Sequence, residues 1–365
     1  MTSSDFGQFR PPRPERRGRG RGGRRKGRRA DDIMVPDAQI EHLDSRGYYG
    51  HPVVKAPPWE TPVAVYLVLG GVAGGSGLLA AGAQLTGHPA LRRSTRLTGL
   101  AAAGAGALAL VADLGRPERF LHMMRTFKVT SPMSVGSWIL MGYSGLIGVA
   151  AAGEVDRLLG DRLPLGSLRP ILRALESPAG LGAGLLGAPL AAYTAVLLGD
   201  TAMPTWNAMH RDLPFVFVSS ASLAAGGAAL ITTPAGQAGP ARDLAVLGVV
   251  GDVVATRLME RRMDPVAAEP LHEGTPGTLM RTAEALAVAG GVGALVAGGR
   301  PGRWRRALAA LSGAALVAAS ACTRFGVFHA GIESAHDPRY TIEPQKRRLA
   351  ARRAAGITGD SITGS

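Results

Sequence analysis

Long stretches without charge dominate the middle of this chain. No Asp, Glu, Lys or Arg occurs within residues 61–91, 129–153, 177–199 or 213–241. A helix needs about 20 mostly apolar residues to cross the roughly 30 Å hydrocarbon core of a membrane. A water-soluble helix would instead interrupt its apolar face with charge about every turn. Each of the four stretches is therefore predicted to be a membrane span.

Shorter apolar stretches occur at residues 97–112, 244–256, 285–299 and 307–323. They reach full span length only by including Asp113, Asp252 or Glu284, or polar flanks. Gly and Ala are frequent throughout, and small residues let membrane helices approach one another closely. The pattern predicts an all-α integral membrane protein with eight transmembrane helices in a compact arrangement.

The apolar block divides the chain into three parts. We predict an Arg-rich arm at 1–58, an eight-helix membrane domain at 59–325 and a polar tail at 326–365 that contacts a partner. Eleven Lys or Arg residues lie between Arg10 and Arg29, in a chain of net charge +14. Such a run cannot bury apolar surface and is predicted to be disordered. Nucleic-acid binding is an alternative, but basic residues beside a span more often fix topology and meet anionic lipid. We therefore expect membrane lipid as a partner and no nucleic acid.

Both tails are basic, which bears on orientation. An even number of spans places both ends on one side, and Lys and Arg favour the cytoplasmic side. We expect a multi-pass protein of the cell (plasma) membrane with both termini in the cytoplasm. The basic residues of the inner loops would then face outward, and these are Arg92, Arg93, Arg96, Arg303, Arg305 and Arg306.

The single cysteine and the eight histidines limit cofactor chemistry. Cys322 alone cannot ligate an iron–sulfur cluster. Every histidine lies in a predicted tail or loop, or at a span terminus, whereas a transmembrane haem needs facing ligands inside two helices. Zinc-type spacings of His and Cys are also missing from the sequence. We expect no haem, no iron–sulfur cluster and no metal in this chain.

The most specific segment follows the second predicted span. It reads DLGRPERF at 113–120 and continues to SPMSVGSW at 131–138. Pro117 disfavours a helical conformation at Arg116, so the helix is predicted to break after Asp113. A carboxylate that directly follows sixteen uncharged residues lies at or below the membrane interface. Ionisable groups in that position are costly and mark functional sites.

The next helix is predicted to begin within the same segment. Ser131 or Thr130 can cap it, with Pro132 in its first turn. The sequence here closely resembles the NrfD, or polysulfide-reductase membrane-subunit, family. The hallmark of that family is an Asp-Leu-Gly-Arg-Pro-x-Arg-Phe turn followed by Ser-Pro-Met-Ser-x-Gly-Ser-Trp. Supporting segments are NAMHRDLPF at 207–215, FHAG at 328–331 and DPRY at 337–340. The resemblance covers roughly residues 58–345.

The resemblance implies two four-helix bundles and a quinone site near the membrane surface. It also implies a partner iron–sulfur (ferredoxin-like) subunit that connects this chain to a large molybdopterin-type catalytic subunit. The protein would anchor the complex and pass electrons between that partner and menaquinone or ubiquinone. The site for the terminal substrate would then lie on another subunit.

Quinone chemistry needs proton carriers or hydrogen-bond donors at the ring oxygens and an apolar slot for the ring. Tyr66 and Trp138 fit such a site and fit equally an aromatic belt at the membrane interface. His210 fits the site or an ordinary surface position. The predicted quinone-binding residues are Tyr66, Asp113, Arg116, Arg119, His122, Ser134, Ser137, Trp138 and His210.

A proton path is predicted from Asp252 in the sixth span together with Tyr193 and Asp200 near the end of the fourth. The alternative for Asp252 is a structural ion pair with Arg257 or a neighbouring helix. Two other functions remain open, a secondary transporter with internal repeats and a purely structural anchor. The predicted partner contacts are Glu118, Arg211, His329 and Arg339.

Overall fold

The computed structural model describes residues 52–114, 118, 125, 127–298 and 302–356. In this part of the chain all regular structure is helical. The long helices are α2 (Thr61–Leu85), α3 (Pro89–Asp113), α5 (Pro132–Leu158), α6 (Leu168–Gly199), α8 (Leu213–Thr232), α9 (Gly239–Arg262), α11 (Gly274–Val296), α12 (Arg303–His336) and α13 (Arg339–Ala354). Short helices connect them, namely α7 (Pro204–Ala208), η4 (Ala235–Gln237), α10 (Pro265–Ala268) and η5 (Glu269–Leu271).

Seven of the described helices are long and apolar enough to cross a membrane, namely α2, α3, α5, α6, α8, α11 and α12. The sixth predicted span lies in α9, which is 24 residues long. This helix does not meet the same criterion of length and apolar composition. Arg242 and Asp243 precede its apolar segment, Asp252 lies within that segment, and Arg257 directly follows it. The chain is therefore a multi-pass helical protein, and the number of eight spans stays a prediction.

Two predicted stretches were too long because they ran across helix ends. The stretch 61–91 contains the end of α2 and the start of α3. Gly87 between them has φ 72°, a left-handed conformation that glycine adopts readily. Pro89 then occupies the first turn of α3, a position that suits proline. The stretch 213–241 likewise covers α8, a turn after Pro234 and the start of α9.

Helix α2 is the most deeply buried of the spans and packs against α3, α6, α8 and α12. Small residues allow its close contact with α6. A Cβ atom at Gly74 would lie 2.5 Å from the carbonyl oxygen of Gly187, and the reverse substitution would meet the oxygen of Gly74 at the same distance. Side chains on either glycine would push the two helices apart. The abundance of glycine thus serves helix packing, as membrane helices often require.

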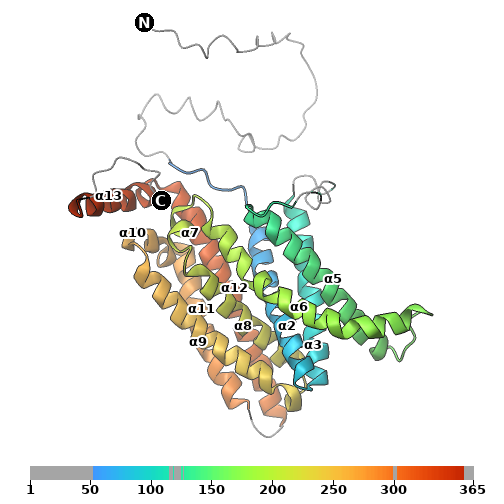
Figure 1. The fold of residues 1–365 in the computed structure, drawn as a ribbon. Helices are drawn as coiled ribbons and strands as arrows, with labels where there is room; N and C mark the ends of the chain where they lie inside the picture. The colour runs from blue at the N-terminus through green and yellow to red at the C-terminus, as the bar shows by residue number, and fades with distance from the viewer. Residues whose placement is uncertain (1–51, 115–117, 119–124, 126, 299–301, 357–365) are drawn as a thin grey trace, which may run out of the picture. The chain divides into compact units, whose positions relative to one another are not determined.

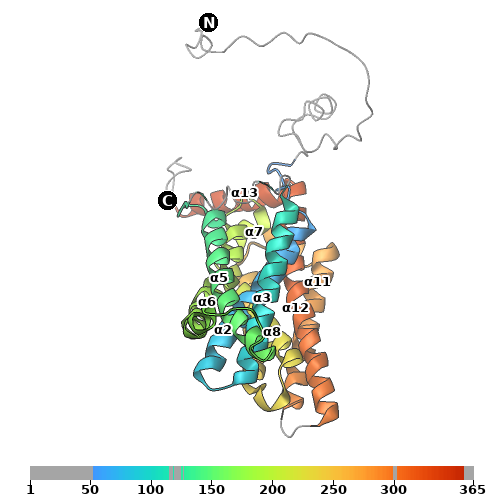
Figure 2. The ribbon, with the colours of Figure 1, turned by 90° about the vertical axis from the view of Figure 1, so that its right-hand side faces the viewer.

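Figures 1 and 2 show the spans running side by side. Helices α2, α3, α5 and α6 contact one another, as do α8, α9, α11 and α12. Because α2 also packs on α8 and α12, the two sets share an extensive boundary. The division into two bundles of four stays a prediction.

One end of this helical unit, called here the α13 end, is where α2 begins and α3 finishes and where α7, α10 and α13 lie (Figure 1). The boundary that we placed between residues 325 and 326 falls inside α12, which continues to His336. Helix α13 then runs across the end of the spans (Figures 1 and 2). Residues 1–51 of the predicted disordered arm lie outside the described residues.

Candidate functional site

An apolar cavity of about 380 Å³ opens near the α13 end of α2, α3, α5 and α6. This volume falls within the range of small-molecule sites, about 300–1,000 Å³. Most of its wall is aliphatic, with a few polar groups from different helices. We call it the tyrosine cavity. Its lining comprises Trp59, Val63, Tyr66, Leu67, Ala107, Leu110, Asp113, Leu114, Met133, Ser137, Leu140, Met141, Ser144, Tyr193 and Leu197.

Two phenol hydroxyls meet in the wall of the tyrosine cavity. Tyr66 on α2 is 2% exposed, and its hydroxyl is hydrogen-bonded to the hydroxyl of Tyr193 on α6. Their ring centroids lie 6.4 Å apart. In such a pair one hydroxyl donates to the other, which leaves one hydrogen for a further acceptor. The pair can therefore offer one hydrogen-bond donor to a ligand in the cavity.

Asp113 brings a carboxyl group to the same cavity. It is the last residue of α3, and Leu114 continues in an extended conformation. The Asp113 carboxylate faces the backbone of Glu60, just before α2. Ser137 and Ser144 from α5 also line the cavity, but the hydroxyl of Ser137 donates to the carbonyl of Met133 at 2.9 Å. Asp113 is thus the acidic group available to a ligand here.

Local sequence explains how α5 and α6 present these side chains. Ser131 caps α5, its hydroxyl accepting from the backbone N–H of Ser134 at 3.4 Å, and Pro132 stands in the first turn. This confirms the predicted start of the helix. Gly136, one turn further on, lies directly under the ring of Tyr193, where any Cβ atom would overlap that ring. The glycine therefore permits Tyr193 to reach Tyr66.

The structure brings together only some of the predicted quinone-binding residues. Tyr66, Asp113 and Ser137 line the tyrosine cavity, whereas Arg116, Arg119 and His122 lie outside the described residues. Ser134 and Trp138 lie near the start of α5 but do not belong to the lining. The hydroxyl of Ser134 accepts from the N–H of Lys128 at 3.0 Å. Trp138 packs edge-to-face on Phe127, with centroids 5.9 Å apart.

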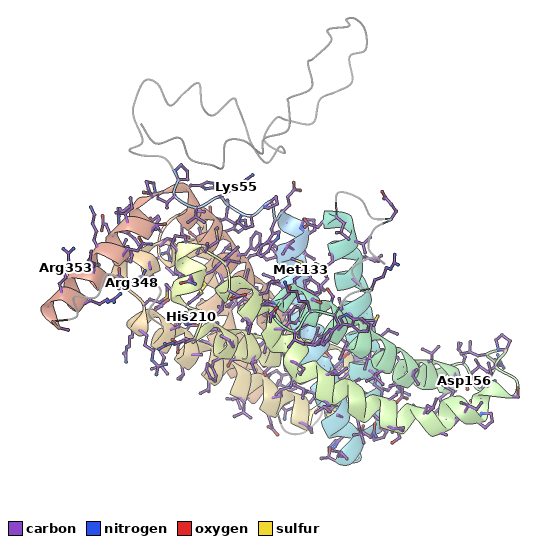
Figure 3. All side chains as sticks on the ribbon, turned by 45° about the horizontal axis from the view of Figure 1, so that its top comes forward. Lys55, Met133, Asp156, His210, Arg348 and Arg353 are labelled. Atoms are coloured by element: carbon purple, nitrogen blue, oxygen red, sulfur yellow. The ribbon has the colours of Figure 1, made fainter. Side chains whose placement is uncertain are left out.

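His210 lies at a different place. Its side chain is exposed and lines a pocket with Asn207, Arg262, Tyr340 and Arg348. The imidazole Nδ1 lies 2.7 Å from the carbonyl oxygen of Asn207. In Figure 3 His210 and Met133, a residue of the tyrosine cavity, occupy separate positions. Burial in this neighbourhood raises the pKa of Tyr340 above its ordinary value.

The three residues of the predicted proton path are also dispersed. Tyr193 belongs to the tyrosine cavity, while Asp252 lines a second pocket between α9, α11 and α12. Asp200 follows the end of α6 and is exposed. Arg257 forms an ion pair with Glu284 of α11 at 2.5 Å and not with Asp252. The other form of that alternative, an ion pair of Asp252 with a neighbouring helix, stays a prediction.

The predicted partner contacts occupy varied surroundings at the α13 end. Glu118 and Arg211 are exposed, and His329 is half-buried beside the ring of Phe328, 5.6 Å between centroids. Arg339 is hydrogen-bonded to Glu269, which raises the pKa of its guanidinium.

Buried arginines are the main feature that sequence reasoning missed. We expected Arg96 in an outward loop, but α3 begins at Pro89, so Arg96 lies inside the helix and is 1% exposed. Arg324, just beyond the predicted eighth span, is 0% exposed. The four-residue spacing of Arg92 and Arg96 was an available signal, because it places both on one helix face. In the described part of the protein, no three His, Cys, Asp or Glu side chains gather as metal ligands do.

Span-length apolar helices with an open cavity of small-molecule size define a multi-pass membrane protein with a ligand-sized site. The family model described as "Polysulphide reductase, NrfD" matches residues 52–255. The chain therefore belongs to the NrfD family. This match includes α2 to α8, and so the whole lining of the tyrosine cavity.

Two curated relatives agree with this assignment. A component of the polysulfide reductase of Wolinella succinogenes is 28% identical over 172 residues, which is 44% of this protein and 54% of that relative. Protein NrfD of Escherichia coli is 33% identical over 196 residues, 47% of this protein and 58% of that relative. The protein thus spans somewhat over half the length of each. By its name, the first relative is one polypeptide of a polysulfide reductase.

Proposed function

We propose that this protein is the quinone-reacting membrane subunit of a multisubunit oxidoreductase. It would pass electrons between a partner iron–sulfur subunit and menaquinone or ubiquinone in the cell membrane. The tyrosine cavity carries this proposal, because it combines aliphatic walls with a tyrosine pair and one carboxyl group. Membership of the NrfD family supports it.

The cavity residues fit the needs of a quinone. Aliphatic side chains from α2, α3 and α5 can hold the ring and the first part of the tail. The free hydrogen of the Tyr66–Tyr193 pair can be donated to a ring oxygen. Asp113 can take up or release a proton at the opening of the cavity. Reduction of a quinone consumes two electrons and two protons, and the electrons would be exchanged with the partner's iron–sulfur cluster.

The tyrosine hydroxyls provide the test. Tyr66→Phe and Tyr193→Phe each remove a hydroxyl and keep the ring, so packing should survive. We expect each variant to lower quinone turnover by the assembled complex in membranes by about 100-fold, a typical loss for a proton-transferring group. Lipid extracts of the purified complex should also contain less quinone.

Tyr143→Phe is the matched control. Tyr143 is a buried tyrosine of α5 whose hydroxyl donates to the carbonyl of Ala73 at 2.5 Å, away from the cavity lining. Its loss should leave quinone turnover within about twofold of the parent, because general acid–base chemistry needs the group at the reacting atoms. Unchanged turnover and bound quinone in both cavity variants would contradict the proposal and favour a structural anchor. Solute uptake by the protein alone would favour a secondary transporter.

We further propose that the partner subunit docks at the α13 end. This end is rich in exposed positive charge, and Figure 3 shows Arg348 and Arg353 on α13. Exposed arginines steer and orient a partner with an acidic face. Docking here would bring the partner's cluster to the end of the protein where the tyrosine cavity opens. A large molybdopterin-type subunit would then hold the terminal substrate, and both termini of this protein would be cytoplasmic.

A further inference from the structure

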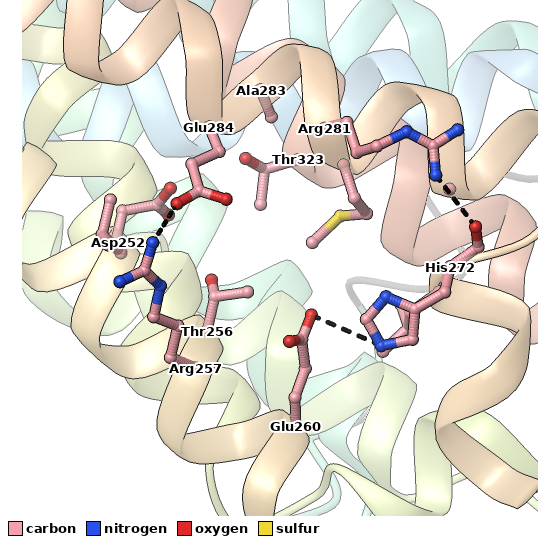
Figure 4. A pocket seen from close by; sticks show the side chains of 13 residues that line it. Asp252, Thr256, Arg257, Glu260, His272, Arg281, Ala283, Glu284 and Thr323 are labelled. Carbon is pink, nitrogen blue, oxygen red and sulfur yellow. Dashed lines mark hydrogen bonds and ion pairs between the residues drawn. The ribbon is translucent and has the colours of Figure 1, made fainter. Parts of the chain in front are cut away.

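A second pocket, of about 140 Å³, lies between α9, α11 and α12. The tyrosine cavity has one ionisable acid in its lining, whereas several charged groups of both signs line this pocket (Figure 4). Toward the outside, Glu260 approaches His272, 4.0 Å between carboxylate oxygen and Nε2. Both have exposed side-chain surface, 26% for Glu260 and 57% for His272. We call this the Asp252 pocket, because Asp252 is its most deeply buried carboxylate.

Asp252 is 5% exposed, and its Oδ1 atom has no hydrogen-bond partner. A buried polar atom without a partner is costly. The charge of this carboxylate is balanced from a distance, since Arg257 instead binds Glu284 at the edge of the pocket (Figure 4). A bound proton would satisfy the buried oxygen and remove the buried negative charge.

Arg324 provides the opposite charge. Its guanidinium is fully buried, and it interacts electrostatically with Asp252. Nη1 donates to the carbonyl of Leu67 at 2.8 Å, and Nη2 donates to the carbonyl of Phe217 at 2.7 Å. The guanidinium carbon also lies 4.4 Å from the centroid of the Phe217 ring. Gly71 makes room for it, because a Cβ there would lie 2.6 Å from Nη2.

This arginine lies between the two pockets. Leu67 accepts its hydrogen bond and also lines the tyrosine cavity, next to Tyr66 in the sequence. On the other side, Thr323, the residue before Arg324 on α12, lines the Asp252 pocket, and Arg324 interacts electrostatically with Asp252. Charges interact strongly where water is excluded. A change of charge at Asp252 therefore alters the net potential that Asp252 and Arg324 together create in the tyrosine cavity.

We propose that Asp252 is a proton-binding site coupled through Arg324 to the charge of the ligand in the tyrosine cavity. This inference rests on the proposed quinone function. In the coupled step the Asp252 carboxylate binds one proton from the Glu260–His272 side and becomes a neutral carboxylic acid. The positive charge of Arg324 is then no longer offset, so negative charge in the tyrosine cavity is favoured. By reciprocity, negative charge in the cavity favours protonation of Asp252 by the same factor.

The other charged groups around Asp252 do not replace this pair. On its own helix Arg257 is held by Glu284 of α11, and these side chains are 63% and 50% exposed. Helix α8 contributes no charged residue between Leu213 and Thr232. Arg281 of α11 donates to the carbonyl of His272 at 3.1 Å, near the outer part of the pocket. Among the described groups, Arg324 is thus the fully buried positive charge that interacts electrostatically with Asp252.

Two ring-sized probes separate charge from shape. Lawsone is a hydroxynaphthoquinone that is ionised at neutral pH, and menadione is a neutral naphthoquinone. Their affinities would be measured on the full-length protein in lipid nanodiscs. Asp252→Asn imitates the protonated acid, so we expect lawsone to bind about fivefold more tightly, the lower end of typical coupling. Menadione affinity should not change. Arg324→Gln should weaken lawsone binding selectively, and Arg324→Lys should restore part of it.

Infrared difference spectra test the proton itself. Lawsone binding should increase the carbonyl band of a protonated carboxylic acid, and Asp252→Asn should abolish that increase. Asp243→Asn is the matched control, since Asp243 is an exposed carboxylate on the same helix. If Arg324→Gln fails to assemble, the double variant with Asp252→Asn removes both buried charges and should restore assembly.

The outcomes distinguish the two proposals. The coupling would be overturned if lawsone and menadione affinity changed in parallel. It would also be overturned if Asp252→Asn did not change the lawsone-induced carboxylic acid band. Either result would leave the quinone site intact. Failure of both probes to bind the parent protein, or binding that Tyr66→Phe and Tyr193→Phe leave unchanged, would overturn the quinone site and the coupling together.

Discussion

At the scale of single residues, the tyrosine pair depends on Gly136, which has no Cβ atom. The ring of Tyr193 occupies the space that a Cβ atom at Gly136 would need. Tyr66 is held similarly, because a Cβ at Gly106 of α3 would lie 3.2 Å from its Cδ2 atom. Glycines on α3 and α5 therefore set the positions of the two hydroxyls, although neither contributes a functional group.

Gly136→Ala should displace the ring of Tyr193 and separate the hydroxyl pair. Misplacement of a reacting group by about 1 Å can reduce a rate by about 100-fold. We therefore expect quinone turnover in membranes to fall at least about tenfold, with helix content retained. Gly145→Ala on the same helix is the control, because no atom lies within 4 Å of its Cβ position. Equal turnover in the two alanine variants would show that the ring position is unimportant.

At the scale of helices, a network of ion pairs and hydrogen bonds joins α2, α3, α5 and α6 at the end remote from α13. Nη1 of Arg96 donates to Glu154 at 3.0 Å and to Glu176 at 2.5 Å, and its Nη2 donates to Gln84 at 2.6 Å. Arg157 also binds both carboxylates. We call this set the Arg96 network. It connects the four helices that line the tyrosine cavity, but at their opposite end.

Arg96→Gln should remove the fully buried cation that the two carboxylates share and leave Arg157, which is partly exposed, to balance both. Removing one partner of a buried ion pair commonly costs about 3–5 kcal/mol of unfolding free energy. We expect a clear fall in the denaturant midpoint of the detergent-solubilised protein. Arg93→Gln should have little effect, since Arg93 is exposed on the same helix. Matching midpoints for the two variants would mean that the network does not stabilise the four helices.

At the scale of the whole helical unit, the proposed quinone site and the proposed docking surface both lie at the α13 end. The tyrosine cavity opens at this end of the unit. The basic helix α13 lies at the same end. Ion pairs from Arg339 to Glu269 and from Arg347 to Asp264, the latter at 3.2 Å, hold α13 on the bundle. Beyond them, Lys346, Arg348, Arg352 and Arg353 are exposed.

Replacing Lys346, Arg348 and Arg352 by Gln should weaken docking of an acidic partner. We expect a smaller share of the iron–sulfur subunit to co-purify with this variant than with the parent protein in mild detergent. The difference between variant and parent should diminish at higher salt, because salt screens the charges. The control replaces Arg93, Arg162 and Arg303, three exposed arginines at the opposite end. Equal retention of the partner in both triple variants would place the docking surface elsewhere.

The sequence by itself determined the features that depend on neighbours along the chain. Hydropathy indicated the spans, a proline-containing turn placed Asp113 at the end of α3, and Ser131 with Pro132 marked the start of α5. These features follow from burial in lipid and from local backbone chemistry. Tyr66 and Asp113 could therefore be assigned to one predicted quinone site before the cavity that they share was visible.

Only the tertiary structure decided which distant groups meet. Tyr193 pairs with Tyr66 across 127 positions, and Arg324 binds the carbonyl of Leu67 across 257. Arg96 changed from an expected loop residue to the centre of a buried network, because α3 begins earlier than its apolar run. Charge patterning shows where an arginine is costly in a membrane. The packing of several helices decides whether a carboxylate or carbonyl is near enough to offset that cost.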